Sequence, residues 1–254
     1  MKNKVVMVVM FLIAYLGFLI ATLPATVVLK HVSLPKSLNN SVKLAGVSGS
    51  VWHTRIEQVI YQGTRIEKVD TRLNAWSLLS LTPTLAITFG DAFSTGPEGQ
   101  LDLALSSDTA AISNLSLLVN ANDIAQQLPL PLPMTAKGSV ALNIATGVFD
   151  LNKANQCITT QGNAAWSKAG VIALEQDVKL GALNADIGCD KGELTLAISP
   201  NNDLGLTFTA YVHKGGKVSG KGYLKPGANF PAPLNDALPF LGRKDSRGRY
   251  RLAF

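Results

Sequence analysis

The chain is poor in the side chains on which enzymes rely. It has three histidines and two cysteines among 254 residues, and only 16% of its residues are charged. The histidines, His31, His53 and His213, are far apart in sequence, and the glycines are scattered rather than gathered before a helix as in a phosphate-binding loop. We therefore predict no catalytic, metal-binding or cofactor-binding residues, no small-molecule substrate and no enzymatic activity.

The charge pattern also disfavours nucleic-acid binding. The net charge of +6 falls to +4 when Lys2 and Lys4 are set aside. No basic run carries the interleaved aromatic residues that a single-stranded nucleic-acid site requires. Because 47% of the residues are apolar, the chain has enough material for a core and is expected to fold.

Charge is absent altogether from Val5 to Leu29, directly after Lys2 and Lys4. About 20 apolar residues in a helix cross a hydrocarbon core of roughly 30 Å. The sequence therefore predicts one transmembrane helix over residues 5–29. The preceding lysines predict that residues 1–4 stay in the cytoplasm and that residues 30–254 are exported.

A cleaved secretory signal is the alternative interpretation of the same segment. Its apolar run is longer than the usual core of a signal peptide, and Leu23 and Pro24 before a cut at Ala25 fit a cleavage site poorly. An uncleaved anchor is therefore favoured, with Pro24 near its outer end.

Cys157 and Cys189 both lie in the part predicted to be exported. An oxidising compartment favours pairing, so we predict a disulfide between them. Two independent buried thiols are the alternative.

Short alternating runs separated by Gly, Asn and Asp follow from Lys43 onward and are typical of antiparallel strands. The clearest runs are Thr64 to Leu73, Gly99 to Leu105, Gly138 to Ile144, Val178 to Ala185, Gly192 to Ile198, Gly205 to Val212 and Lys217 to Leu224.

Two segments interrupt this pattern. Trp76 to Leu81 predicts a short helical turn, and Asn122 to Leu128 predicts an N-capped helix that ends before proline. The Pro-Leu-Pro-Leu-Pro stretch at 129–133 predicts an extended connection and a possible seam between two halves. A proline-rich ligand for another domain is the alternative interpretation of that stretch.

The segment Gly46-Val-Ser-Gly49-Ser-Val-Trp52-His resembles the opening strand and turn of protein N of the type II, or general, secretion pathway. The resemblance continues through Val69, Leu73 and Trp76, and then through Cys157, Gly162 and Trp166. It also covers Leu180-Gly181, Cys189 and Gly192, and it ends at Leu241-Gly242 with Gly248-Arg249-Tyr250.

The resemblance implies a single-pass protein of the cell inner membrane. The implied fold is mainly β: a single N-terminal transmembrane helix followed by a curved, largely antiparallel, open and groove-like β-sheet in the periplasm. The implied role is that of a non-enzymatic accessory component in the export of folded proteins across the outer membrane. Its expected partners are other inner-membrane components of the secretion system and the lipid bilayer.

Several residues are candidates for a structural or an interaction role: Gly46, Gly49, Trp52, Trp76, Trp166, Arg249 and Tyr250. Each tryptophan could anchor a partner or fill a core. The basic stretch from Arg243 to Arg251 could meet an acidic partner or lipid headgroups. Alternatively, it forms a solvated turn and a final strand, with Arg249 and Arg251 on one side and Tyr250 and Leu252 on the other.

Two functions remain open from the sequence. The first is a secretion component that works through protein–protein contacts at strand edges or on the face of the sheet. The second is a carrier for lipid or another hydrophobic ligand, held on an apolar face that stays open as a groove.

Overall fold

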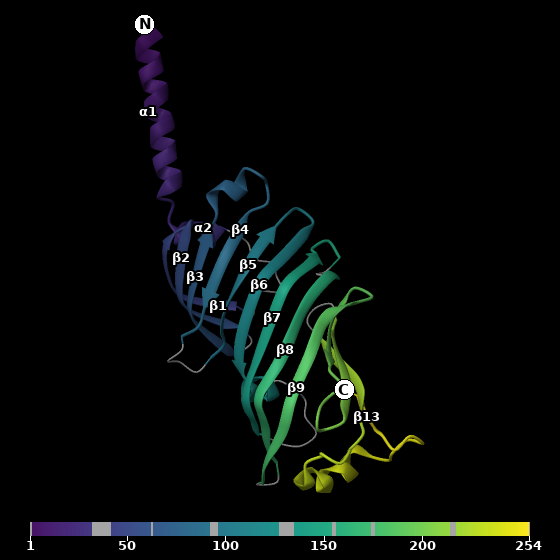
Figure 1. The fold of residues 1–254 in the computed structure, drawn as a ribbon. Coiled ribbons are helices and arrows are strands. Elements are labelled where there is room, and N and C mark those ends of the chain that lie inside the picture. The colour runs from purple at the N-terminus through teal and green to yellow at the C-terminus, as the bar shows by residue number, and fades with distance from the viewer. Residues whose placement is uncertain are drawn as a thin grey trace. The chain divides into compact units, whose positions relative to one another are not determined.

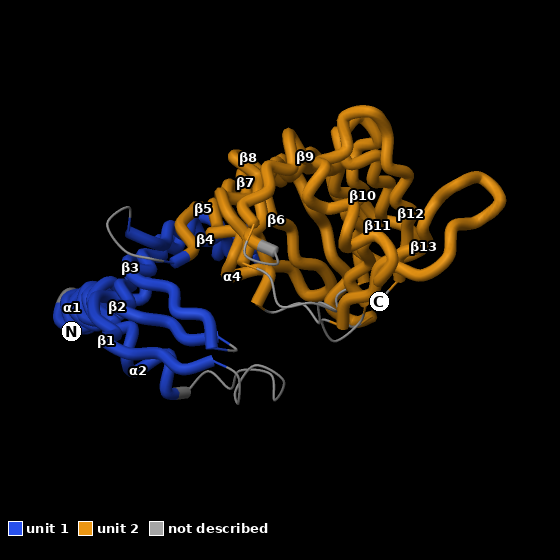
Figure 2. Tube along the Cα trace, turned by 90° about the horizontal axis from the view of Figure 1, so that it is seen from below, with its two compact units in different colours: residues 1–96 blue, residues 97–254 orange. Residues whose placement is uncertain are grey.

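A computed structural model of the chain describes residues 2–31, 42–61, 63–91, 96–126, 135–153, 156–173, 176–213 and 217–253. The protein is mainly β, with an apolar N-terminal helix and thirteen antiparallel strands that follow one another in chain order in an open sheet (Figure 1). The fold class predicted from the sequence is confirmed. The chain forms two compact units, residues 1–96 and 97–254 (Figure 2).

Among its described residues, unit 1 has two helices, a 3-10 turn and four strands. These are α1 (Lys2–Ala21), α2 (Ala25–His31), β1 (Val42–Ser50), β2 (His53–Tyr61), β3 (Thr64–Leu73), η1 (Ala75–Leu78) and β4 (Thr84–Phe89).

In the part of unit 2 that the structure describes there are nine strands, a short helix and a longer 3-10 helix. These are β5 (Glu98–Leu105), β6 (Thr109–Asn120), α4 (Ala121–Ala125), β7 (Thr135–Asp150), β8 (Gln156–Ala173), β9 (Gln176–Asp190), β10 (Glu193–Ile198), β11 (Leu206–Val212), β12 (Val218–Leu224), η3 (Ala232–Leu241) and β13 (Tyr250–Ala253).

The apolar N-terminal stretch divides into two helices rather than forming the single helix predicted over residues 5–29. Helix α1 ends at Ala21, and α2 begins at Ala25. Pro24 lies between them, and it has no amide N–H with which to continue the hydrogen bonding of α1. The window Lys4–Ala21, with a mean hydropathy of 2.5, is 0% buried and is long enough to cross a membrane.

The two predicted helical turns exist but are shorter than expected. The turn η1 has Asn74 as its N-cap, whose side chain accepts a hydrogen bond from the Trp76 amide at 3.0 Å. Helix α4 is capped by Asn120, not by Asn122 as predicted, because Asn120 accepts from the Asn122 amide at 2.9 Å. The predicted seam at 129–133 lies outside the described residues.

The sheet of unit 2 has one apolar face and one polar face. Strand register places Leu117, Leu142, Ala164, Ala185 and Ile198 opposite one another from β6 to β10. The neighbouring row is polar, with Ser116, Asn143, Asn163 and Asp186 in register. Since side chains alternate between faces along each strand, the two rows lie on opposite sides of the sheet.

The core of unit 2 lies on the apolar face and is closed at one end by η3. There, Leu238 of η3 packs in one cluster with Val178 and Leu180 of β9, Leu224 of β12 and Tyr250 of β13. In Figure 2 the trace of unit 2 turns between β8 and β10, so the sheet of this unit is bent around that face.

Candidate functional site

The Gly46–His53 motif forms the hairpin between β1 and β2. Gly46 and Gly49 have backbone φ angles of +67° and +88°, which favour glycine. A Cβ at Gly49 would lie 2.3 Å from the carbonyl oxygen of His53. Glycine at this position therefore lets the two strands approach closely at the turn.

The turn of this hairpin binds the end of the apolar helix. The indole N–H of Trp52 donates to the carbonyl oxygen of Ile20 at 3.0 Å, and the Val51 amide donates to the carbonyl oxygen of Leu23 at 3.0 Å. Pro24 forms a single antiparallel bridge with Ser50. Trp52 thus contributes to the junction between the helix and the sheet, and it is half-buried there.

A charged cluster follows the same hairpin onto β3. His53 Nε2 lies 2.7 Å from Asp70 Oδ2, and Arg55 Nε and Arg72 Nε lie 3.4 Å and 3.5 Å from the Asp70 carboxylate. Partial burial acts to raise the pKa of Asp70, but the hydrogen bonds of His53 and Arg55 and the charges of His53 and Arg72 outweigh it. The pKa of this carboxyl is therefore lowered from its ordinary value.

The two remaining tryptophans have opposite environments. Trp166 on β8 is half-buried, packs against the main core cluster and donates its indole N–H to the carbonyl oxygen of Lys137 at 2.8 Å. Trp76 on η1 is 80% exposed. A structural role therefore suits Trp166, whereas Trp76 is available for contact with something outside the protein.

Cys157 on β8 and Cys189 on β9 form the predicted disulfide, with their Cα atoms 5.7 Å apart. The hydroxyl of the buried Thr160 lies 3.2 Å from Cys157 Sγ and 3.5 Å from Cys189 Sγ. The Cys157 amide also donates to the carbonyl oxygen of Gly192 at 2.9 Å. The bond thus holds the two long central strands together at the end where β9 turns into β10.

The C-terminal candidates, Arg249 and Tyr250, stabilise the last strand. The Arg249 guanidinium lies 2.8 Å from the Asp245 carboxylate and 3.9 Å from the centre of the Tyr223 ring. Its hydrogen bonds to Asp245 lower the pKa of that carboxyl. Tyr250 is 8% exposed and lies opposite Leu224 of β12. Strand β13 begins at Tyr250, so a final strand forms with Tyr250 buried and Arg251 exposed, and Arg249 lies one residue before it.

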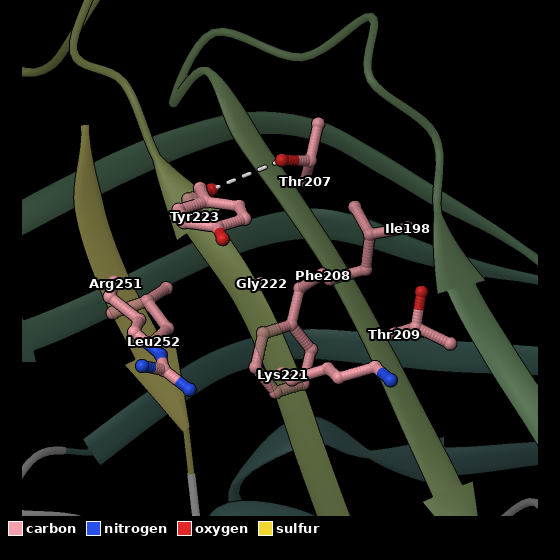
Figure 3. Close-up of a pocket in the computed structure, with 9 residues that line it drawn as sticks. All are labelled: Ile198, Thr207, Phe208, Thr209, Lys221, Gly222, Tyr223, Arg251 and Leu252. Carbon is pink, nitrogen blue, oxygen red and sulfur yellow. Dashed lines mark hydrogen bonds between the residues drawn. The ribbon is translucent and has the colours of Figure 1, made fainter. Parts of the chain in front are cut away.

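A shallow hollow of about 400 Å³ lies beside this strand, over β11, β12 and β13 (Figure 3). Gly222 is at its centre, where an added Cβ would lie 2.1 Å from the Thr207 carbonyl oxygen. Lys221 and Arg251 are among the residues that line it, and none of its lining residues is acidic. The hollow therefore offers positive charge and hydroxyl groups at the end of the sheet.

The structure assembles one polar group that sequence reasoning missed. His213 Nδ1 lies 2.6 Å from Glu193 Oε1, and His213 Nε2 lies 2.6 Å from Ser219 Oγ. The order of atoms is that of a serine–histidine–acid triad, in which the histidine would accept the serine proton. Its members are 20 and 6 residues apart in sequence, and the pairing of β10, β11 and β12 brings them together.

This trio is best explained as a cross-strand network. The His213 and Glu193 side chains are 36% and 37% exposed, so water competes for their hydrogen bonds. None of the three residues lines the hollow beside β13. Within the described ranges, no group of three or more His, Cys, Asp or Glu side chains is arranged to hold a metal ion.

Together, these features define a class of protein in which an exposed apolar N-terminal helix is joined to an open antiparallel sheet. Residues 40–253 match the family model described as type II secretion system (T2SS), protein N. The chain belongs to the type II secretion system protein N family.

Curated relatives match this chain over nearly their whole length. The chain is 30% identical over 258 residues to the type II secretion system protein N of Aeromonas hydrophila, covering 100% of this chain and 98% of the relative. It is 26% identical to the protein of the same name of Vibrio cholerae serotype O1, and the match covers 98% of this chain and 97% of that protein. It is 27% identical to the type II secretion system protein N of Klebsiella pneumoniae, and the match covers 98% of this chain and 94% of that protein. No solved structure matches the chain.

Proposed function

We propose that this protein is a non-enzymatic accessory component of the type II secretion system, anchored in the inner membrane by α1. The N-terminus lies in the cytoplasm, and the sheet lies in the periplasm. Family membership supports the secretion role, and the wholly exposed apolar window Lys4–Ala21, whose one charged residue is Lys4 at its start, supports the anchor. The sheet works by contacting other components of the system.

The observation that carries this proposal concerns the two end strands of the sheet: β1 is covered by other parts of the chain, whereas β13 has a neighbouring strand on one side. On β1, α2 packs against the strand, and the Pro24–Ser50 bridge occupies its last residue. Strand β13 is paired with β12, and no further strand follows it in the described part of the chain. An unpaired strand edge exposes backbone N–H and C=O groups to which another extended chain can bind.

The charge beside β13 indicates what kind of chain would bind. Arg251 is exposed on β13, and Lys221 lies on the neighbouring strand. Arg249 is held in place by Asp245 and by the Tyr223 ring, which limits its role to structure. An extended segment with acidic side chains on a partner protein would match this edge in both hydrogen bonding and charge.

Co-purification from gently solubilised membranes tests the proposal. Wild-type full-length protein should recover other secretion components, and Arg251→Glu should recover less of them because the charge at the edge is reversed. Lys179→Glu makes the same charge change at an exposed position on β9 and should behave like wild type. Equal recovery by all three proteins, or recovery of no secretion component, would contradict this proposal.

A second function is favoured by one observation, the incomplete cover of the apolar face. Several side chains on that face of unit 2 are only partly buried, among them Leu115, Leu142, Leu194 and Leu196. A hydrophobic ligand such as a lipid could complete their burial. Stoichiometric lipid in the same purification, with secretion components absent, would support this function over the first.

A further inference from the structure

The loop between β3 and β4, residues 74–83, exposes large apolar side chains and buries a polar one, which is the reverse of the usual arrangement. Trp76, Leu79 and Leu81 are 80%, 78% and 84% exposed, while Ser77 is only 9% exposed. Single exposed apolar residues are common on protein surfaces, but here three residues that are mostly exposed fall within a stretch of six, and Leu78 between them is 40% exposed. We call these three side chains the loop tip.

Hydrogen bonds hold the loop in this arrangement. Ser77 Oγ donates to the carbonyl oxygen of Asn74 at 2.5 Å and accepts from the Thr84 amide at 2.9 Å. The Thr82 amide donates to the carbonyl oxygen of Ser77 at 3.3 Å, and the Ser80 hydroxyl donates to the same oxygen at 2.9 Å. The polar groups of the loop therefore bond to one another, which leaves the apolar side chains directed outward.

The backbone at Leu81 adds to this observation. Its φ is +56°, in the left-handed region that non-glycine residues rarely adopt. In water, the Leu81 side chain is almost fully exposed to solvent. Burial of this side chain therefore does not offset the cost of the strained backbone. An apolar surrounding for Leu81 would supply that burial.

Hydrogen bonds also connect the loop to the end of the apolar helix. The Trp52 indole bonds to the carbonyl oxygen of Ile20 on α1, and the Trp52 carbonyl oxygen accepts from the Leu73 amide at 3.0 Å. Leu73 is the last residue of β3, and the loop begins with the next residue. The loop therefore starts one residue from the point at which the sheet contacts the last turn of α1, which in Figure 1 projects from the edge of unit 1 beside β2.

We propose that the loop tip inserts into the interfacial region of the same bilayer that α1 crosses, as a second membrane contact of unit 1. This inference rests on the membrane anchor of the proposed function. Tryptophan favours the interface, where its ring is buried and its N–H reaches water, and leucine gains by leaving water. Residues 74–90 contain no charged side chain, so insertion requires no charge to leave water.

Two membrane contacts would restrict the orientation of unit 1. A single helix that ends at a proline lets the attached unit tilt, whereas a second contact opposes that tilt. The alternative is that a partner protein buries the loop tip. The continuity with α1 favours the bilayer.

Tryptophan quenching in membranes tests the proposal. Full-length protein is reconstituted into phosphatidylcholine and phosphatidylglycerol vesicles whose acyl chains are brominated close to the headgroup. Bromine quenches a tryptophan that lies at that depth. Trp76→Phe should lower the quenched fraction of the emission, because it removes an inserted fluorophore. Trp166→Phe is the matched control and should raise that fraction, because it removes a fluorophore that is half-buried in unit 2.

A second variant keeps the fluorophore and removes its apolar neighbours. Leu79→Ser together with Leu81→Ser should shift the Trp76 emission to the red and reduce its quenching by bromine. Ile158→Ser, at a side chain 54% exposed on β8, should do neither.

The outcomes separate this inference from the proposed function. If wild type floats with the vesicles but Trp76→Phe leaves the quenched fraction unchanged or raises it, the loop is not inserted and the anchor stands. If wild type does not float with vesicles, the anchor and the inserted loop both fail. If Trp76 is shielded from aqueous acrylamide only when secretion components are present, a protein occupies the patch and the inference is overturned.

Discussion

At the scale of single residues, two polar clusters of this protein join neighbouring strands. Glu193, His213 and Ser219 bond across β10, β11 and β12, and His53 and Asp70 do so across β2 and β3. Each group lies on the sheet surface, where water weakens such interactions. Their effect is to stabilise strand register rather than to perform chemistry.

The Asp70 cluster predicts a pH-dependent contribution to stability. Because the pKa of Asp70 is lowered in the folded protein, its contribution is complete above the ordinary value of 3.8 and is lost as the pH falls through the lower folded value. Asp70→Asn should therefore lower the free energy of unfolding at pH 7 by about 1–2 kcal/mol.

Urea unfolding of the full-length protein in detergent, followed by circular dichroism at pH 7 and near pH 3, measures this difference. The gap between Asp70→Asn and wild type should narrow at the lower pH. Asp236→Asn, at an exposed carboxylate on η3, is the control and should match wild type at both values. If the difference in free energy of unfolding between Asp70→Asn and wild type is the same at both pH values, the charge of Asp70 does not contribute to stability.

Residue-level interpretation from sequence was least reliable for the tryptophans. All three are surrounded by similar apolar and small polar residues in sequence, yet one contacts the end of α1, one packs on the core and one is exposed. Burial of a side chain depends on which strands lie opposite it, and local sequence does not contain that information.

At the scale of elements, the strands were predicted well where apolar and polar residues alternate clearly. The predicted run from Thr64 to Leu73 coincides with β3, and the last run, Lys217 to Leu224, lies within one residue of β12. The 18-residue strand β8 was missed, because Thr, Gly, Asn and Ala along it give little contrast between its two faces. Its pairing with β7 and β9 on both sides forms the strand despite this weak pattern.

The disulfide between β8 and β9 should stabilise the pairing of these two long strands. Closing a loop with a sequence separation of 32 residues is worth about 4 kcal/mol in the chain-entropy model. Cys157→Ser should therefore lower the melting temperature of the protein under oxidising conditions.

The comparison with reduced protein completes this test. After reduction, wild type should melt close to the double variant Cys157→Ser/Cys189→Ser, in which neither thiol is present. If oxidised and reduced wild type melt at the same temperature, the bond does not contribute to stability.

At the scale of the whole molecule, the central question is on which side of the membrane the sheet lies. Lys2 and Lys4 precede an uncharged stretch, and from this arrangement we propose that the N-terminus stays in the cytoplasm. Alkaline phosphatase, which is active only in an oxidising compartment, should therefore be active when fused after Phe254.

A reporter that folds only in the cytoplasm, fused at the same position, should be inactive, and the full-length chain should remain in the membrane fraction after carbonate washing. Activity of the cytoplasmic reporter would reverse the proposed topology. Release of a shortened chain by the wash would support a cleaved signal instead of an anchor.

The sequence by itself determined the class of fold, because the period of two along the strands and the charge-free N-terminal stretch are local properties of the chain. It also indicated the disulfide, since each of the two cysteines, in a chain predicted to be exported, has one possible partner within it. Tertiary structure decided which side chains meet across strands, that Trp76 is exposed on the loop after β3, and that β13 ends the described sheet. These features depend on register and on contacts between residues far apart in the chain, which no local pattern encodes.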